Sequence, residues 1–290
     1  AFCHSVFNVS TTFMLLPFSK QLEKLALVVI KDKAEAETYT LIDERLLHSP
    51  SFAIAECNNM TVKMAELARD NLFESISMMH NFQDKKADEI VQNEDKLDMF
   101  EDKLGSYLVK ISSRSLTDKD SGDTAKLLRI IGDLERIGDH SVNILDIARE
   151  INEKNIIFSD EATSELKTLT NALTEILTNT VEAFKNEDLS LAGKIEPLEQ
   201  VIDNTVETVK KRHIVRLQNG ECTIELGFVL SDILANYERV SDHCSNIAVC
   251  MLEIEHGGFD THEYLHDVKK ENGPEFSKAL MEYSEKYSLK

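Results

Sequence analysis

Paired acidic residues at one-turn helical spacing are the feature of this sequence with the clearest chemical potential. On a helix, residues i and i+4 lie on the same face, so two carboxylates at this spacing repel each other unless water or a cation lies between them. Carboxylate oxygens are the preferred ligands of hard divalent cations. Four such pairs stand out: Glu94 and Asp98, Glu135 and Asp139, Glu199 and Asp203, and Glu238 and Asp242.

Two of these pairs belong to a string of residues that occurs twice, 103 residues apart. The first copy runs from Asp133 to Ile144 (DLERIGDHSVNI) and the second from Asn236 to Ile247 (NYERVSDHCSNI). The other two pairs begin 41 and 39 residues upstream of the glutamate in each copy. An internal repeat of this kind predicts two structurally equivalent halves.

The repeat also predicts where the carboxylates meet. If the two acidic helices of each half are antiparallel neighbours, four carboxylates surround one point, a site suited to iron, manganese, magnesium or calcium, with zinc not excluded. Most single acid pairs at this spacing are solvated faces, and Glu66/Asp70 and Glu263/Asp267 show that the spacing also occurs elsewhere. Because the four pairs share matching positions of the repeat, we predict a metal site or polar cluster in each half.

Other polar residues of the repeated string lie beside these acids. Arg136 and Arg239 directly follow the glutamates, and we expect salt bridges with carboxylates, with an oxyanion as the alternative partner. Asn143 and Asn246 lie four residues past the aspartates and return to the same face, where they could hydrogen-bond the metal-binding carboxylates. The histidine after each aspartate points away by about 100°, which favours a polar boundary position over a ligand.

Sequence motifs of common enzymes are missing. There is no G-x-S-x-G nucleophile turn, no P-loop and no Gly-rich dinucleotide turn. A di-iron oxidase of the ferritin type needs Glu-x-x-His on two separate helices, and the two matches, Glu253/His256 and Glu263/His266, lie in one late segment. We therefore expect a non-enzymatic protein, with a carboxylate-bridged metalloenzyme as the less favoured alternative.

Composition predicts an all-α fold. The 290 residues include only 10 Gly, 4 Pro and no Trp, and they are rich in helix-forming residues. Hydrophobic periodicity predicts two three-helix antiparallel repeats, residues 61–154 and 160–256, with Pro197 expected to kink the fifth helix or delay its start. The net charge of −20 argues against nucleic-acid binding. A helical tail is expected over residues 257–290.

The beginning of the chain differs from the rest in its charge. Residues 1–19 contain no charged side chain, and lysines follow at once. This pattern predicts that residues 1–30 end a membrane domain, with the chain downstream in the cytoplasm. A buried soluble helix is the alternative. Residues 31–60, which include Pro50, read as a linker that ends in the start of a helix.

The strings ERIGDHSVNI and ERVSDHCSNI resemble the PhoU family of phosphate-uptake regulators over about residues 60 to 256. The resemblance implies a six-helix domain of two three-helix repeats with E-x-x-x-D motifs, whose acidic faces can hold iron or other metal clusters. The eight acids of the four pairs fall on the motif positions. Departures from the pattern are Asn236, where the first repeat has Asp133, and Pro197 next to Glu199.

The flanking segments resemble a narrower group. HSVFN at residues 4–8, LPF at 16–18 and LIDERLL at 41–47 are similar to the end of the membrane domain and the linker of bacterial type II-like Na+/phosphate cotransporters. The resemblance implies a cytoplasmic PhoU-like regulatory domain at the cell membrane, whose partners are a transporter domain in the same polypeptide, sodium and phosphate. A homo-oligomer is a further expectation. The alternative is a free-standing PhoU-type regulator.

Overall fold

The computed structural model describes residues 43–255 and 274–289, and these residues form helices joined by short turns, with no strand among them. The all-α prediction is therefore confirmed. The elements in chain order are η2 (Glu44–His48), α3 (Pro50–Met78), α4 (Asp84–Ser112), α5 (Asp118–Lys154), α6 (Asp160–Asn186), α7 (Leu189–Ala192), α8 (Ile195–Gln218), α9 (Ile224–Glu255) and α11 (Pro274–Lys286).

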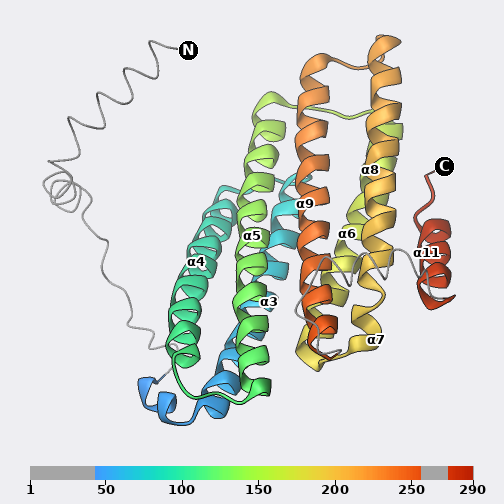
Figure 1. The fold of residues 1–290 in the computed structure, drawn as a ribbon. Helices are drawn as coiled ribbons and strands as arrows, with labels where there is room; N and C mark the ends of the chain where they lie inside the picture. The colour runs from blue at the N-terminus through green and yellow to red at the C-terminus, as the bar shows by residue number, and fades with distance from the viewer. Residues whose placement is uncertain (1–42, 256–273, 290) are drawn as a thin grey trace, which may run out of the picture. The chain divides into compact units, whose positions relative to one another are not determined.

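The long helices form two layers. Helices α4, α5, α9 and α8 lie side by side in one layer, and α3 and α6 lie behind it (Figure 1). The first repeat is α3, α4 and α5, and the second is α6, α8 and α9. The predicted pair of three-helix repeats is thus present, and α5 and α9 form the main contact between the repeats.

The first long helix begins earlier than the sequence pattern predicts. Helix α3 starts at Pro50, so residues 50–60 are helical and do not belong to the predicted linker. Proline is favoured in the first turn because no helical partner exists there for its missing N–H, and Ala53, Ile54 and Cys57 are already buried. The predicted membrane segment (1–30), the linker up to residue 42 and tail residues 256–273 lie outside the described residues.

Pro197 delays a helix start, as predicted. The expected fifth helix is divided into α7 and α8, and Pro197 is the third residue of α8. A proline in the first turn costs no hydrogen bond, because the first four N–H groups of a helix have no acceptor within it. Helix α8 therefore runs unbroken to Gln218 and carries Glu199 and Asp203 on one face.

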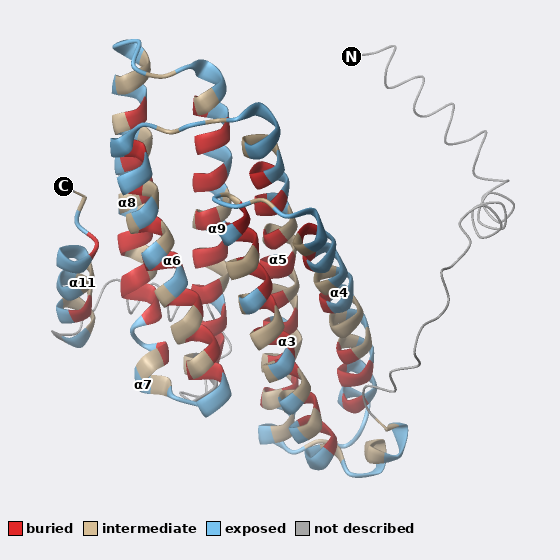
Figure 2. Ribbon diagram, turned by 180° about the vertical axis from the view of Figure 1, so that it is seen from behind, coloured by how far each residue is buried: buried red, intermediate tan, exposed pale blue. Residues whose placement is uncertain are grey.

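Apolar side chains between the two layers form the core. The buried residues follow the inward faces of the helices, while the outward faces are exposed (Figure 2). Leu104, Leu134, Leu173, Leu198 and Leu234 are all at most 1% exposed. Burying one such side chain contributes about 1.5–3 kcal/mol. This apolar core therefore fixes the positions of the helices that carry the acid pairs.

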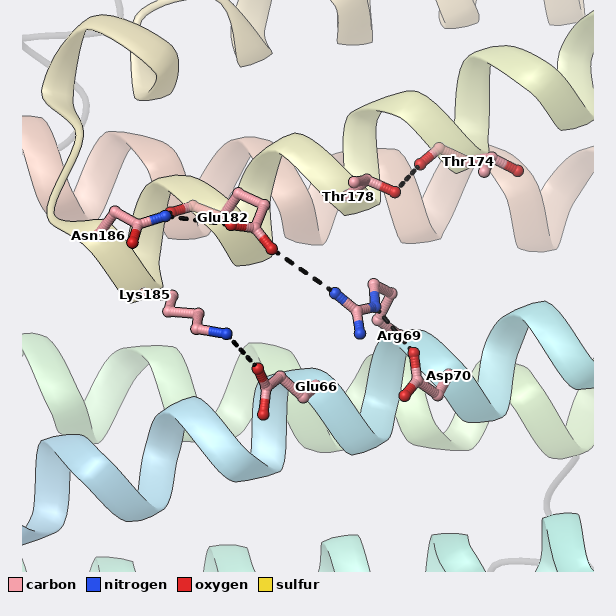
Figure 3. Close-up of polar contacts among 8 residues, drawn as sticks. All are labelled: Glu66, Arg69, Asp70, Thr174, Thr178, Glu182, Lys185 and Asn186. Atoms are coloured by element: carbon pink, nitrogen blue, oxygen red, sulfur yellow. Dashed lines mark hydrogen bonds and ion pairs between the residues drawn. The ribbon is translucent and has the colours of Figure 1, made fainter.

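The rear layer joins the repeats through exposed ion pairs. Between α3 and α6, Lys185 Nζ lies 2.8 Å from Glu66 Oε1 and Arg69 Nη1 lies 4.0 Å from Glu182 Oε1 (Figure 3). Exposed pairs of this kind contribute at most about 1 kcal/mol each. The α5–α9 contact in the front layer is the more extensive of the two connections between the repeats.

Candidate metal centres

We call Glu94, Asp98, Glu135 and Asp139 the first acidic centre. Helix α4 supplies the first two side chains and α5 the others. One carboxylate oxygen from each of Glu94, Asp98 and Asp139 lies within 4.8 Å of the others. Glu135 lies outside this triad, but its charge raises the pKa of Glu94. The structure thus brings three of the four predicted residues together and places the fourth beside them.

The first acidic centre has uncompensated negative charge. Burial first, and then neighbouring carboxylates, raise the pKa of Glu94, Asp98 and Glu135 above the ordinary values. Within residues 43–255 and 274–289, no hydrogen bond or ion pair reaches any of its four carboxylates. Arg136 only lowers the pKa of Glu135 through its charge. Such a centre attracts a cation because the carboxylates repel one another.

The second acidic centre, Glu199, Asp203, Glu238 and Asp242, lies between α8 and α9. Oxygens of Glu199, Asp203 and Asp242 lie within 4.8 Å of one another. The fourth residue, Glu238, again lies outside the triad, and its Oε2 accepts a hydrogen bond from Lys210 Nζ at 2.9 Å. The triads of the two centres occupy equivalent positions of the repeat.

A ninth carboxylate, which the sequence reading missed, belongs to the second centre. Glu196 is only 7% exposed, and Ser245 Oγ donates a hydrogen bond to its Oε2. Its charge is among the causes that raise the pKa of Asp242, after burial, which is the largest. Glu196 lies three residues before Glu199 and so on the same helical face, a spacing that would have revealed it in the sequence.

The donor sets fit a hard divalent cation. Each triad offers three carboxylate oxygens close enough to share one ion, and no thiol or imidazole belongs to either triad. Oxygen-only sets suit magnesium, calcium, manganese and iron better than thiol-seeking metals.

A family model describes the same two halves. The model of the PhoU domain matches residues 61–148 and 166–251, which together hold all eight predicted acids. The chain belongs to the PhoU domain family. This confirms the predicted resemblance to the PhoU family and the internal repeat, whereas the match does not extend to the segments that resemble a cotransporter.

PhoU proteins resemble the chain over most of their length. It is 28% identical over 208 residues to "Phosphate-specific transport system accessory protein PhoU homolog 1" of Thermotoga maritima, covering 71% of this chain and 88% of the relative. It is 24% identical to the PhoU homolog of Xylella fastidiosa strain 9a5c, over 68% of this chain and 82% of the relative.

Solved PhoU structures share the fold. PhoU from Pseudomonas aeruginosa has a TM-score of 0.65 at 18% identity, covering 70% of this chain and 97% of that one. The phosphate transport system regulatory protein PhoU from Streptococcus pneumoniae has a TM-score of 0.65 at 17% identity, over 73% and 99%. The predicted PhoU-like fold is thereby confirmed.

The predicted arginines behave differently in the two halves of this PhoU domain. Arg239 Nη1 lies 3.5 Å from Asp242 Oδ2, so Arg239 pairs with a carboxylate of its own helix. Arg136 is exposed and acts on Glu135 through its charge. Arg136 lies on α5 and Arg239 on α9.

The predicted asparagines do not support the acidic centres in the expected way. Asn246 Nδ2 donates to Asp133 Oδ1 at 3.3 Å, across the contact between the repeats. Asn143 is exposed, and no hydrogen bond joins it to the aspartates. Asn246 therefore takes part in the contact between α5 and α9 and not in the second acidic centre.

The histidines of the repeated string join the two PhoU repeats. His243 Nδ1 lies 2.9 Å from Asp133 Oδ1, and His140 Nδ1 lies 2.8 Å from Asn236 Oδ1. The two contacts are equivalent by the repeat, and the imidazole centroids lie 5.7 Å apart. We call these four residues the histidine seam. The sequence reading predicted only a polar boundary position for the histidines.

The described helices also bear on the membrane prediction. None of those within residues 43–255 and 274–289 combines the length and the apolar character needed to cross a bilayer.

Proposed function

We propose that this chain regulates phosphate uptake as a PhoU-type accessory protein. The observation that carries the proposal is the match of the PhoU domain model to both repeats. Relatives from Serratia marcescens and Escherichia coli carry the name "Phosphate-specific transport system accessory protein PhoU". These names support a regulatory role over an enzymatic one, with a phosphate transport system as the partner.

The proposal includes a divalent cation in each acidic centre, with iron the preferred ion and manganese, magnesium, calcium or zinc as alternatives. A bound cation would supply positive charge between α4 and α5, and between α8 and α9. The carboxylates would hold it and be drawn together, because their mutual repulsion would be neutralised. Metal loading would thus tighten each pair of helices and give the regulator two states to present to its partner.

A second form of the proposal joins the regulator to its transporter. Here residues 1–30 end the membrane domain of a sodium-dependent phosphate transporter, residues 31–49 are a linker, and the domain from α3 to α9 is held at the cytoplasmic side of the cell membrane. The uncharged run at residues 1–19 favours this form. The relatives' names favour a separate accessory protein, which we prefer.

Deletion of the gene in its native host tests the proposal. We expect uptake of radiolabelled phosphate to stay high in phosphate-rich medium, where the parent strain reduces it. The wild-type gene should restore regulation, whereas the double variant Asp98→Asn, Asp203→Asn should not. The control Asp146→Asn, which changes an exposed acid paired with Arg149, should restore it fully.

Two outcomes discriminate between the readings. A deletion strain that matches its parent in both phosphate-rich and phosphate-poor media would refute the regulatory role. Fractionation of cells expressing the native gene separates the two forms, since only a chain joined to a transporter stays with membranes after a high-salt wash.

A further inference from the structure

A histidine and a cysteine meet where the second repeat turns from α8 to α9. His213 lies on α8, Cys222 lies in the turn that follows, and His213 Nδ1 is 3.9 Å from Cys222 Sγ. Cys222 is half-buried, whereas the other cysteines that the structure describes, Cys57, Cys244 and Cys250, are buried. Burial raises the pKa of Cys57 and Cys244 to about 12. Among the described cysteines, Cys222 is therefore the thiol that a reagent in solution can reach.

Packing alone does not explain the histidine. His213 is 7% exposed, and its Nε2 is buried with no hydrogen-bond partner among the described residues. A buried polar atom in this state destabilises the fold. The equivalent residue of the first repeat is Leu108, since each lies fourteen residues after the first glutamate of its acidic centre. Leu108 is fully buried, so an apolar side chain fills this position in the other half, and the imidazole of His213 points to a chemical use of the ring.

The surroundings of the imidazole determine which ring nitrogen carries the proton. Burial and then the charge of Arg216 lower the pKa of His213, while Glu165 opposes them, so the ring is neutral at pH 7. Nε2 faces Gly227, where an added Cβ would lie 2.8 Å from it. A proton on Nε2 would make a buried N–H with no acceptor, which proteins avoid more strictly than an unsatisfied acceptor. The proton therefore belongs on Nδ1, and this N–H donates toward the sulfur of Cys222.

The other groups near the sulfur affect its thiolate form in opposite directions. Cys222 lies two residues before α9, and the positive end of a helix stabilises a thiolate. The charges of Arg216 and of a Cys222 thiolate act on each other, but the guanidinium is paired with Glu165 at 2.7 Å. Glu221, the residue before the cysteine, is an exposed acid that opposes a second negative charge. The N–H of His213 is thus the donor that favours the thiolate by direct contact.

We infer that Cys222, assisted by His213, is a site of oxidation by hydroperoxides such as hydrogen peroxide. The thiolate sulfur attacks one peroxide oxygen, and an S–O bond forms as the O–O bond breaks. The sulfur is oxidised by two electrons, and the departing hydroxide takes up the proton that left the thiol, so the products are sulfenic acid and water. Within the described residues, the pair belongs to no group of three potential metal ligands, which favours thiol chemistry over a metal site.

The chain offers a matched set of variants, all made together with Cys3→Ser because Cys3 lies outside the described residues. Cys222→Ser removes the reactive sulfur. His213→Leu introduces the side chain found in the first repeat and removes the donor, whereas His213→Asn keeps an amide N–H near the place of Nδ1. His48→Leu is the control, because it changes an exposed histidine of η2 in the other half.

Reaction of the full chain with hydrogen peroxide at pH 7 tests the inference, with dimedone to trap sulfenic acid and mass spectrometry to locate it. We expect the label on Cys222, at a rate about tenfold above that of the same cysteine in the chain unfolded with urea. His213→Leu should lower the rate at Cys222 about tenfold, and His213→Asn should restore part of it. His48→Leu should leave the rate unchanged, and Cys222→Ser should abolish the label. Circular dichroism checks that each variant is folded.

Three results would overturn the inference: no label on Cys222 in the folded chain, a rate no faster than in the unfolded chain, or a rate that His213→Leu leaves unchanged. The comparison of folded and unfolded chains needs no histidine variant, so it decides the question even where a substitution disturbs folding. An equal loss of rate in His48→Leu would also overturn it, because the effect would then not depend on contact with the sulfur.

Discussion

Single side chains determine the electrostatics of the first acidic centre. Glu94 is half-buried, and the charges of Asp98, Asp139 and Glu135 surround it. Burial is the largest cause that raises its pKa, and these carboxylates add to the effect. Without metal, the centre thus works against folding, because the unfolded chain separates and hydrates the same charges.

Replacing Glu94 by Gln should stabilise the metal-free protein. We expect the free energy of unfolding at pH 7, measured with urea in the presence of a chelator, to rise by about 0.5 kcal/mol, the scale of like-charge helix pairs. The control Glu89→Gln, at an exposed acid paired with Lys85, should not stabilise. A Glu94→Gln protein that is less stable than wild type without metal would show that the centre is not repulsive.

The raised pKa values in the first acidic centre should make the metal-free wild-type protein more stable as the pH falls from neutral. Because the pKa of Glu94, Asp98 and Glu135 is raised in the folded state, the folded chain binds protons at these sites before the unfolded chain does. Their contribution to stability therefore increases as the pH falls from neutral toward the ordinary carboxyl pKa of about 4. The stability difference between Glu94→Gln and wild type should shrink over the same range, which urea titrations at several pH values measure.

At the scale of the elements, close packing of α4 against α5 holds the first centre together. Gly138 precedes Asp139, and a Cβ there would lie 2.7 Å from Leu97 Cδ1, next to Asp98. Leu97 is fully buried, so a larger residue at position 138 must displace a packed side chain. The spacing of the two acidic faces therefore depends on the absence of a side chain at Gly138.

Two alanine substitutions in α5 separate packing from helix propensity. Both Gly138→Ala and Gly132→Ala gain propensity, but a Cβ at Gly132 meets no atom within 4 Å. We expect Gly132→Ala to stabilise by up to about 1 kcal/mol, and Gly138→Ala to be less stable than it by about 1–3 kcal/mol because of overpacking. Equal thermal denaturation curves for the two variants would contradict this account of the α4–α5 contact.

The histidine seam is the second feature at this scale, and it joins α5 to α9. Removing Asp133 would leave the mostly buried His243 without its acceptor, at a cost of about 1–3 kcal/mol. Asp133→Asn should cost less than Asp133→Ala, because Asn236 already accepts from His140 in the equivalent contact. Urea denaturation ranks the two variants. Equal losses for Asn and Ala would mean that Asp133 acts through its charge alone, since both variants remove the charge and only Asn keeps an acceptor.

For the whole molecule, the net charge of −20 and the two acidic centres predict a stability that depends on divalent ions. A ligand that binds only the folded state at 100 times its Kd adds about 2.7 kcal/mol to the free energy of unfolding. We expect Mn²⁺ to raise the Tm and a chelator to reverse the change. The double variant Asp98→Asn, Asp203→Asn should lose this response, whereas Asp146→Asn should keep it, as scanning calorimetry can show. An equal rise in Tm in the double variant would assign the effect to surface charge.

The sequence alone determined the all-α class, the two repeats, a disturbance of the fifth helix at Pro197 and the register of the four acid pairs. These properties depend on local spacing, because a 3.6-residue period fixes which side chains share a face of one helix. Because the two halves are repeats, the face assigned to an acid pair in one half also applies to the equivalent pair in the other. The PhoU family followed from the same residues.

Only the tertiary structure decided which of these side chains meet. A helical face does not specify its neighbour: Glu135 and Glu238 share faces with Asp139 and Asp242, yet both lie outside the triads. Lys210 and Glu238 are 28 residues apart in sequence, and Asp133 and His243 are 110 apart. Their contacts depend on how α8 packs against α9 and α5 against α9, which is set by the shape of the buried core between helices and not by the spacing of residues within one helix.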